Sequence, residues 1–178
     1  MHATQFIRHA LECSADAALK LAEDMRDAPL TFPTRKGGNH PLWIVGHCAV
    51  AESMLIQEFA FGRSHPLAYW MEIFGPGSTP VDDASAYPSF ETVLRTFKET
   101  RAATMAGLGT LTDADLDRPS AAPKEFAQFV GTIGQCYLHT ITHLAVHTGQ
   151  LADARRAIGR EPLLFRPPVP ERTLTASA

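Results

Sequence analysis

The sequence predicts an all-α protein, and within that class a four-helix bundle. Four long stretches carry apolar residues at helical spacing, loops rich in proline and glycine separate them, and no stretch shows the period-two alternation of a half-buried strand. A chain of 178 residues suits a single domain with a sizeable hydrophobic core. We therefore expect one bundle over residues 1–165, followed by a proline-rich C-terminal tail over residues 166–178.

The first two helices are predicted from their apolar stripes and their end signals. The first helix is expected over about Thr4 to Met25, before a segment rich in proline and glycine that ends it. The second is expected over about Pro41 to Phe61, because proline is favoured in a first helical turn and Gly62 follows the last apolar residue. On this helix His47 falls on the apolar stripe, so its imidazole should face the core.

The second half of the chain predicts a long crossover and two more long helices. Residues 63–88 are too long and too rich in proline for a tight hairpin, and should cross over the bundle. This crossover is expected either to cover one end of the bundle and shape a pocket, or to be an ordinary packed connection. Ser89 is the expected N-cap of the third helix, and Thr112 to Asp115 resembles a capping box that begins a short helix. The fourth helix should begin near Phe129 to Thr132 and end at Gly159.

Composition and charge narrow the possible partners and location. Lys and Arg total 16 against 19 Asp and Glu, giving a formal charge of −3 with no long block of either sign, so we expect no nucleic-acid partner. No stretch approaches the roughly eighteen apolar residues of a membrane span, and the N-terminal residues lack the pattern of a signal peptide. The three cysteines are too scattered for a disulfide framework. These features predict a cytoplasmic protein with no membrane partner.

The stretch HTITHLAVHTGQL, on the fourth helix, places three histidines at four-residue intervals. His139, His143 and His147 therefore form one shallow stripe. A metal ion bridges imidazoles one turn apart, but His139 and His147 lie about 12 Å apart along the axis and cannot both reach one ion. The spacing offers two ligand pairs, His139 with His143 or His143 with His147, and leaves both open.

His47 is the candidate for the third ligand, since an inward histidine on the second helix can meet an inward pair on the fourth. Buried imidazoles without partners are costly, and a shared ion would account for all of them. The alternative is a polar seam filled with water. The remaining histidines, His2, His9, His40 and His65, are interpreted as solvated residues.

Other residues near the histidines are interpreted as structural or as part of a pocket. Cys48 and Glu52 point away from the face of His47, so Glu52 should form a salt bridge or face solvent. Cys136 is expected to be a small core residue. Gln150, one turn after His147, either offers an amide to the site or lies on the helix surface. The sequence contains neither the HExxH motif of zinc proteases nor the Glu-x-x-His pair of di-iron bundles.

These patterns together resemble a known family. The pattern WIVGHCAVAE on the second helix, with HLAVHTGQLADARRAIGREPL closing the bundle, resembles the DinB-like superfamily of bacterial metal-binding four-helix proteins, which includes thiol-dependent transferases. The resemblance spans about Thr4 to Leu164. Two positions depart from the pattern of many members: Val146 stands where they have a further histidine, and Thr148 where they have arginine.

The resemblance implies a ligand set, a topology and an assembly. It implies that the metal ligands are His47, His143 and His147. His139 then has no ligand role and should lie on the pocket wall, where it either supports a ligand or faces a substrate, and Gln150 is a further candidate for the pocket. It also implies an up-down-down-up bundle and a homodimer. Imidazole ligands suit zinc or nickel best, with iron also compatible.

Three hypotheses follow for the function of such a site. Three neutral imidazoles leave a divalent ion with an open coordination position. The resemblance to thiol-dependent transferases favours the first hypothesis, a metal-dependent transferase that uses a low-molecular-weight thiol and acts on a small molecule. The alternatives are a metal-dependent hydrolase and a non-catalytic metal-binding stress protein. The sequence assigns no catalytic residue.

Overall fold

The described residues, 1–31 and 38–164 of a computed structural model, form helices and loops, and the only β-pairing among them is an isolated bridge between Pro119 and Thr132. The prediction of an all-α protein is therefore confirmed for this part of the chain. The predicted C-terminal tail, residues 166–178, lies outside the described residues.

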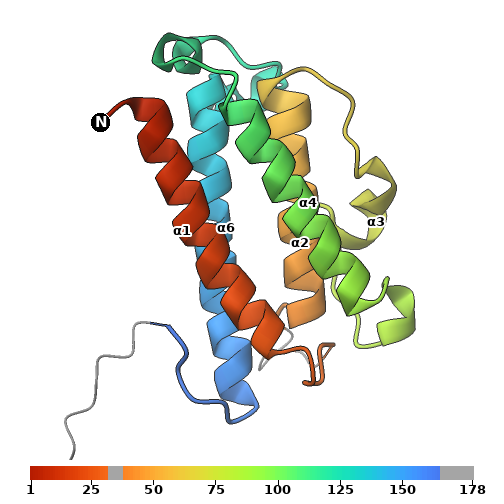
Figure 1. Ribbon diagram of the computed structural model, residues 1–178. Coiled ribbons are helices and arrows are strands. Elements are labelled where there is room, and N and C mark those ends of the chain that lie inside the picture. Colours follow the sequence, from red (N-terminus) through yellow and green to blue (C-terminus); the bar gives the residue numbers. More distant parts are fainter. Residues whose placement is uncertain (32–37, 165–178) are drawn as a thin grey trace, which may run out of the picture.

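Four long helices pack together and make up most of the molecule (Figure 1). They are α1 (Ala3–Asp24), α2 (Pro41–Ser53), α4 (Phe90–Leu108) and α6 (Ile133–Ala157). The helix α1 packs against α6, and α2 packs against both α4 and α6. In Figure 1 the chain runs downward in α1 and α6 and upward in α2 and α4.

The second helix changes its winding at its C-terminal end. Met54–Ala60 continues α2 as a π-helix (η1), which sequence patterns did not predict. Such wider turns are rare and occur often at functional sites. This one packs against α6.

Helix ends follow the signals in the sequence, with one correction. Ser89 caps α4 by accepting a hydrogen bond from the backbone N–H of Thr92, as predicted. Thr112 and Asp115 form the predicted capping box, which begins a short 3₁₀ helix, Asp113–Asp117 (η4), instead of an α-helix. The interpretation of His40 as solvated is wrong: it is fully buried as the N-cap of α2, where its Nδ1 accepts the N–H of Trp43.

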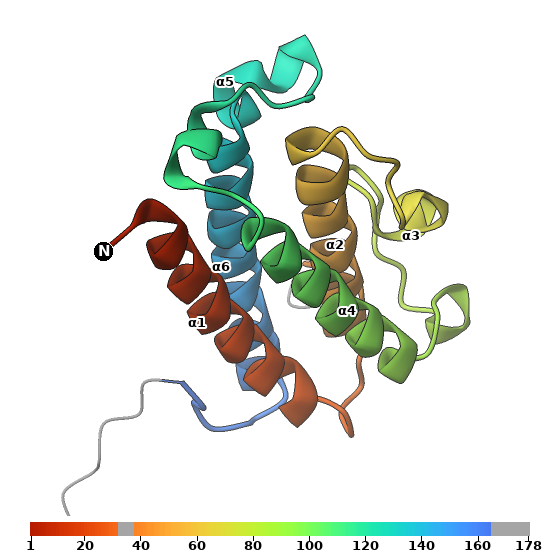
Figure 2. The ribbon, with the colours of Figure 1, turned by 45° about the horizontal axis from the view of Figure 1, so that its top comes forward.

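The crossover runs along the side of α2 and not over one end of the bundle, which corrects the prediction (Figure 2). It holds the short helices η2 (Ala68–Trp70), α3 (Met71–Phe74) and η3 (Ala84–Ala86). The ring of Phe74 lies against Gly46 so closely that a side chain at that position would overlap it. Glycine at position 46 therefore lets the crossover approach α2 directly beside His47.

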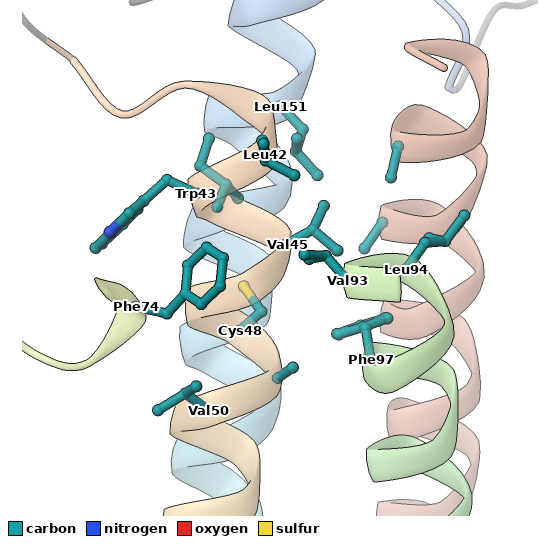
Figure 3. Close-up of a cluster of buried hydrophobic side chains, with 14 of the residues drawn as sticks. Leu42, Trp43, Val45, Cys48, Val50, Phe74, Val93, Leu94, Phe97 and Leu151 are labelled. Carbon is teal, nitrogen blue, oxygen red and sulfur yellow. The ribbon is translucent and has the colours of Figure 1, made fainter. Parts of the chain in front are cut away.

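Two hydrophobic clusters hold the helices together. Residues of α1, α2, α4 and α6, with the crossover residues Trp70 and Phe74, form the first cluster, part of which is shown in Figure 3. The second cluster includes Leu11, Ile56 and Tyr137, and Val130 from the short helix α5 (Ala127–Val130). The short helix before α5, η5 (Lys124–Phe126), lies at the border of this cluster, where the ring of Phe126 stacks on that of Phe59. No helix in the described ranges is long and apolar enough to cross a membrane.

Candidate metal centre

Three histidines from two packed helices converge at the middle of the bundle. His47 lies on α2, and His143 and His147 lie one turn apart on α6. The Nε2 atom of His143 is 3.1 Å from that of His47 and 3.2 Å from that of His147. Ligand atoms of all three lie within 4.8 Å of one another, so the group could hold one metal ion.

In His47 and His147, the Nδ1 atom of the ring lies within hydrogen-bond distance of an oxygen acceptor. His47 Nδ1 is 2.7 Å from the backbone carbonyl of Phe74, and His147 Nδ1 is 2.8 Å from Oε1 of Gln150. A carbonyl oxygen only accepts, so each Nδ1 must carry the hydrogen. Both Nε2 atoms therefore present a lone pair to the centre of the group.

Hydrogen bonds alone do not satisfy this arrangement. Nε2 of His143 carries at most one hydrogen, yet it faces two lone pairs at nearly equal distance. One cation would satisfy all three nitrogens. Tetrahedral zinc with Zn–N bonds of about 2.0–2.1 Å would place its nitrogen ligands about 3.3 Å apart, close to both distances. The donor set thus fits a divalent ion of this kind.

Burial keeps the three imidazoles neutral, which is the form that binds metals. Burial, with a smaller contribution from the neighbouring imidazoles, lowers the pKa of His47 to about 4 and that of His143 to about 3, and the hydrogen bond to the Phe74 carbonyl partly opposes the shift at His47. Burial also lowers the pKa of His147. At neutral pH, protons therefore do not compete for the Nε2 lone pairs.

Trp43 and Asn39 restrict the orientation of the proposed ligands, Trp43 by direct contact with His47 and Asn39 through Gln150. The indole of Trp43 stacks on His47, with ring centroids 4.4 Å apart and planes within 10°, and its N–H donates to the hydroxyl of Ser78. Asn39 Nδ2 donates to Oε1 of Gln150, which in turn holds His147. These contacts leave the rings little freedom to rotate.

A cavity of about 450 Å³ adjoins the histidines. His47, His143 and His139 are the polar side chains of its described lining, and the rest of the lining is apolar. The imidazole of His139 stacks on that of His143 with centroids 6.3 Å apart, outside the group of three. His47 and His143 line this cavity, whereas Trp43, His147 and Gln150 do not belong to its described lining.

The structure places the remaining sequence-predicted residues as follows. Gln150 hydrogen-bonds His147 and does not line this cavity. Glu52 forms the predicted salt bridge, with Arg101, at 2.8 Å. Cys136 is buried in the second hydrophobic cluster, as predicted, and Cys48 is buried in the first.

Three contacts of the site were missed from the sequence. Trp43 lies four residues before His47, so its stacking on the same helix face has a sequence signal. Asn39 lies in a loop and the Phe74 contact uses a backbone carbonyl, so neither has a periodic signal.

Comparison with known proteins identifies the family. No curated protein matches the chain. A family model described as the DinB superfamily matches residues 10–151, a range that contains His47, His143 and His147. This match covers well over half of the sequence and confirms the resemblance seen in the histidine motifs. The chain belongs to the DinB superfamily.

Proposed function

We propose that this protein is a metal-dependent transferase that uses a low-molecular-weight thiol. His47, His143 and His147 would bind one divalent ion, with zinc or nickel favoured over iron. The observation that carries the proposal is the convergence of the Nε2 atoms at the wall of an apolar cavity. An ion held there by three protein ligands keeps a position open for a ligand.

A bound divalent ion would lower the pKa of a coordinated thiol and so supply a thiolate at neutral pH. The residues of the chain hold and orient the site. The Phe74 carbonyl and Gln150 fix the tautomers of His47 and His147. The apolar cavity wall excludes water from the reacting groups and holds the second substrate.

The cavity favours transfer over hydrolysis. Many metal-dependent hydrolases place a carboxylate beside the attacking water as general base, and no carboxylate lines the described part of this cavity. A non-catalytic metal-binding protein would need no substrate cavity at its ligands. Thiol transfer needs only the activated sulfur and a site for the electrophile.

A cobalt-substituted protein tests the thiol step. We expect glutathione, bacillithiol or mycothiol at millimolar concentration to change the visible absorption of the cobalt form, because a sulfur ligand replaces water. A spectrum unchanged by all three thiols would contradict the proposal. If ester, amide or lactam hydrolysis were found instead, its loss in His147→Ala would assign it to this site.

Removing the metal should destabilise the bundle only modestly. Two hydrophobic clusters pack the four long helices without any contribution from the three ligands. We therefore expect the metal-free protein to remain folded and to melt cooperatively at a lower temperature than the loaded protein. Circular dichroism melting curves of both forms check this, and complete unfolding on chelation would contradict it.

The family resemblance also implies an up-down-down-up bundle and a homodimer, and features of the helices support both proposals. The long crossover joins α2 to α4, which run in the same direction in Figure 1. The outer face of α6 is exposed and uncharged from Leu138 to Val146, with Thr142 between them on the same face. We expect a dimer by analytical ultracentrifugation that Val146→Glu converts to a monomer, and a monomeric wild-type protein would contradict this proposal.

A further inference from the structure

The cavity beside the histidines discriminates between ligands by charge. Its lining contains no Asp, Glu, Lys or Arg among the described residues. Away from the proposed metal ion, a charged group inside it would lose its hydration without gaining a partner of opposite sign. The low-molecular-weight thiols named above all carry carboxylate or amino groups or a large polar body. The cavity therefore suits the second substrate and not the body of the thiol.

Two segments supply much of the apolar wall, and one of them is the π-helix η1. The π-helix η1 contributes Met54, Leu55 and Phe59, and the segment before α6 contributes Phe126 and Phe129. The rings of Phe59 and Phe126 are 6.0 Å apart and inclined by 27°. Aromatic side chains favour flat aromatic ligands, and methionine adapts to varied shapes. A cavity of about 450 Å³ has the size of a site for a small organic molecule.

His139 is the polar group of the lining that stands outside the proposed ligand set. Its side chain is half-buried, and neither ring nitrogen has a hydrogen-bond partner among the described residues. It lies one turn before His143 on α6, at the cavity wall. A single donor in an apolar pocket fixes the orientation of one polar atom of a ligand.

We infer that the cavity binds the electrophile of the proposed transfer, and that this electrophile is a neutral molecule with an aromatic body and one oxygen directed at His139. An α,β-unsaturated ketone or an epoxide has this form. The inference rests on the proposed function, but the binding preference of the cavity does not depend on turnover.

The reaction with such a substrate is an addition. The thiolate sulfur forms a bond to carbon, and the electron pair of the C=C π bond or of the C–O bond moves to the oxygen. The proton that the thiol lost is taken up by the product, so no leaving group, oxidant or reductant is required. His139 donates a hydrogen bond to the oxygen through a ring N–H.

Two probes with the same ring system test the charge preference. Phenylnaphthylamine is neutral, and anilinonaphthalenesulfonate adds one sulfonate. Both are titrated fluorimetrically into the metal-free full chain, which is expected to remain folded, so that no metal ion attracts the sulfonate. We expect the neutral probe to bind at least about tenfold more tightly than the anionic one, because no side chain of the described lining carries a positive charge to pair with the sulfonate. Equal or tighter binding of the sulfonate would overturn the inference.

A matched pair of variants locates the bound probe. Phe129 and Phe6 are 58% and 64% exposed, and of these two only Phe129 lines the cavity. Phe129→Glu should weaken binding of the neutral probe by about tenfold, and Phe6→Glu should leave it unchanged. The same loss in both variants, or in neither, would place the probe elsewhere and overturn the inference.

A second pair of ligands tests the role of His139. Benzylacetone and butylbenzene share the phenyl ring and the four-carbon chain and differ in the ketone oxygen. Their affinities are measured by displacement of the neutral probe. His139→Leu should lower the affinity for benzylacetone by about fivefold relative to the affinity for butylbenzene, since the substitution removes one hydrogen bond to the ketone. An unchanged ratio would contradict the assignment of His139.

These measurements separate the two proposals. If the protein binds no metal or thiol, the probe preference still reports on the cavity. If the cavity prefers the anionic probe while the cobalt spectrum responds to thiol, the proposed function stands and the substrate class is wrong. With both supported, thiol consumption should be faster with benzylideneacetone than with its para-carboxylate derivative.

Discussion

Replacing His47 with alanine should abolish stoichiometric metal binding while the protein stays folded. His47 supplies the proposed ligand from α2, and the two remaining imidazoles lie one turn apart on α6. A site with two neutral ligands holds zinc or nickel far more weakly than a site with three. Elemental analysis of protein purified without a histidine tag measures the metal content directly, and His143→Ala should give the same result.

His139→Ala is the matched control for this experiment. Its ring belongs to the same stripe on α6, yet it lies outside the group whose nitrogens converge. We expect full metal content in this variant. Gln150→Leu should bind metal more weakly than His139→Ala and more tightly than His47→Ala. Its metal affinity should be about 10–100-fold below that of the wild type, because the hydrogen bond that orients His147 is lost. Stoichiometric metal in His47→Ala or His143→Ala, or its loss in His139→Ala, would contradict the proposed ligands.

The sequence alone could not decide which histidines of the stripe on α6 bind the metal. Spacing alone offers two equivalent pairs on α6, and only the position of α2 beside α6 brings His47 to the pair with His143 and His147. That position depends on contacts between segments far apart in the sequence. The family resemblance supplied this information indirectly, since the same helix packing determines which histidines family members use.

The long helices were predictable because each has an apolar stripe and marked ends. Ser89, Thr132 and Gly159 lie at the helix ends as expected. The π-helix η1 was not predicted, because its sequence fits an α-helix equally well and the wider turn arises from packing. His40 was misinterpreted because a polar residue next to a proline suggests a solvated loop, whereas its Nε2 hydrogen-bonds the carbonyl of Val81.

Replacing Arg101 with methionine should cause a large loss of stability. Arg101 and Glu52 are 7% and 3% exposed, and their side chains form an ion pair at 2.8 Å between α4 and α2. Arg101 also donates a hydrogen bond to the backbone carbonyl of Leu11. Removing one partner of a buried ion pair leaves the other charge uncompensated and costs about 3–5 kcal/mol. Urea denaturation of the variant and the wild type measures the difference.

Arg95→Met is the matched control, because Arg95 lies on the same helix and pairs with Glu99 at the surface. We expect its effect to stay within about 0.5 kcal/mol. The double variant Glu52→Gln, Arg101→Met should recover much of the stability, since no buried charge remains. A loss below about 1 kcal/mol in Arg101→Met would contradict a structural role for the pair.

The pH dependence of Arg101→Met follows from the titration of Glu52. Burial raises the pKa of Glu52, and the charge of Arg101 partly opposes this. Without Arg101 the pKa of the folded state rises further above that of the unfolded state. A carboxyl group with a raised pKa in the folded state stabilises the fold at low pH, and this contribution is lost as pH rises through the folded-state pKa. The stability difference from the wild type should therefore be larger near pH 8 than near pH 5, and a difference that grows toward acid pH would mean that Glu52 is not the group left unpaired.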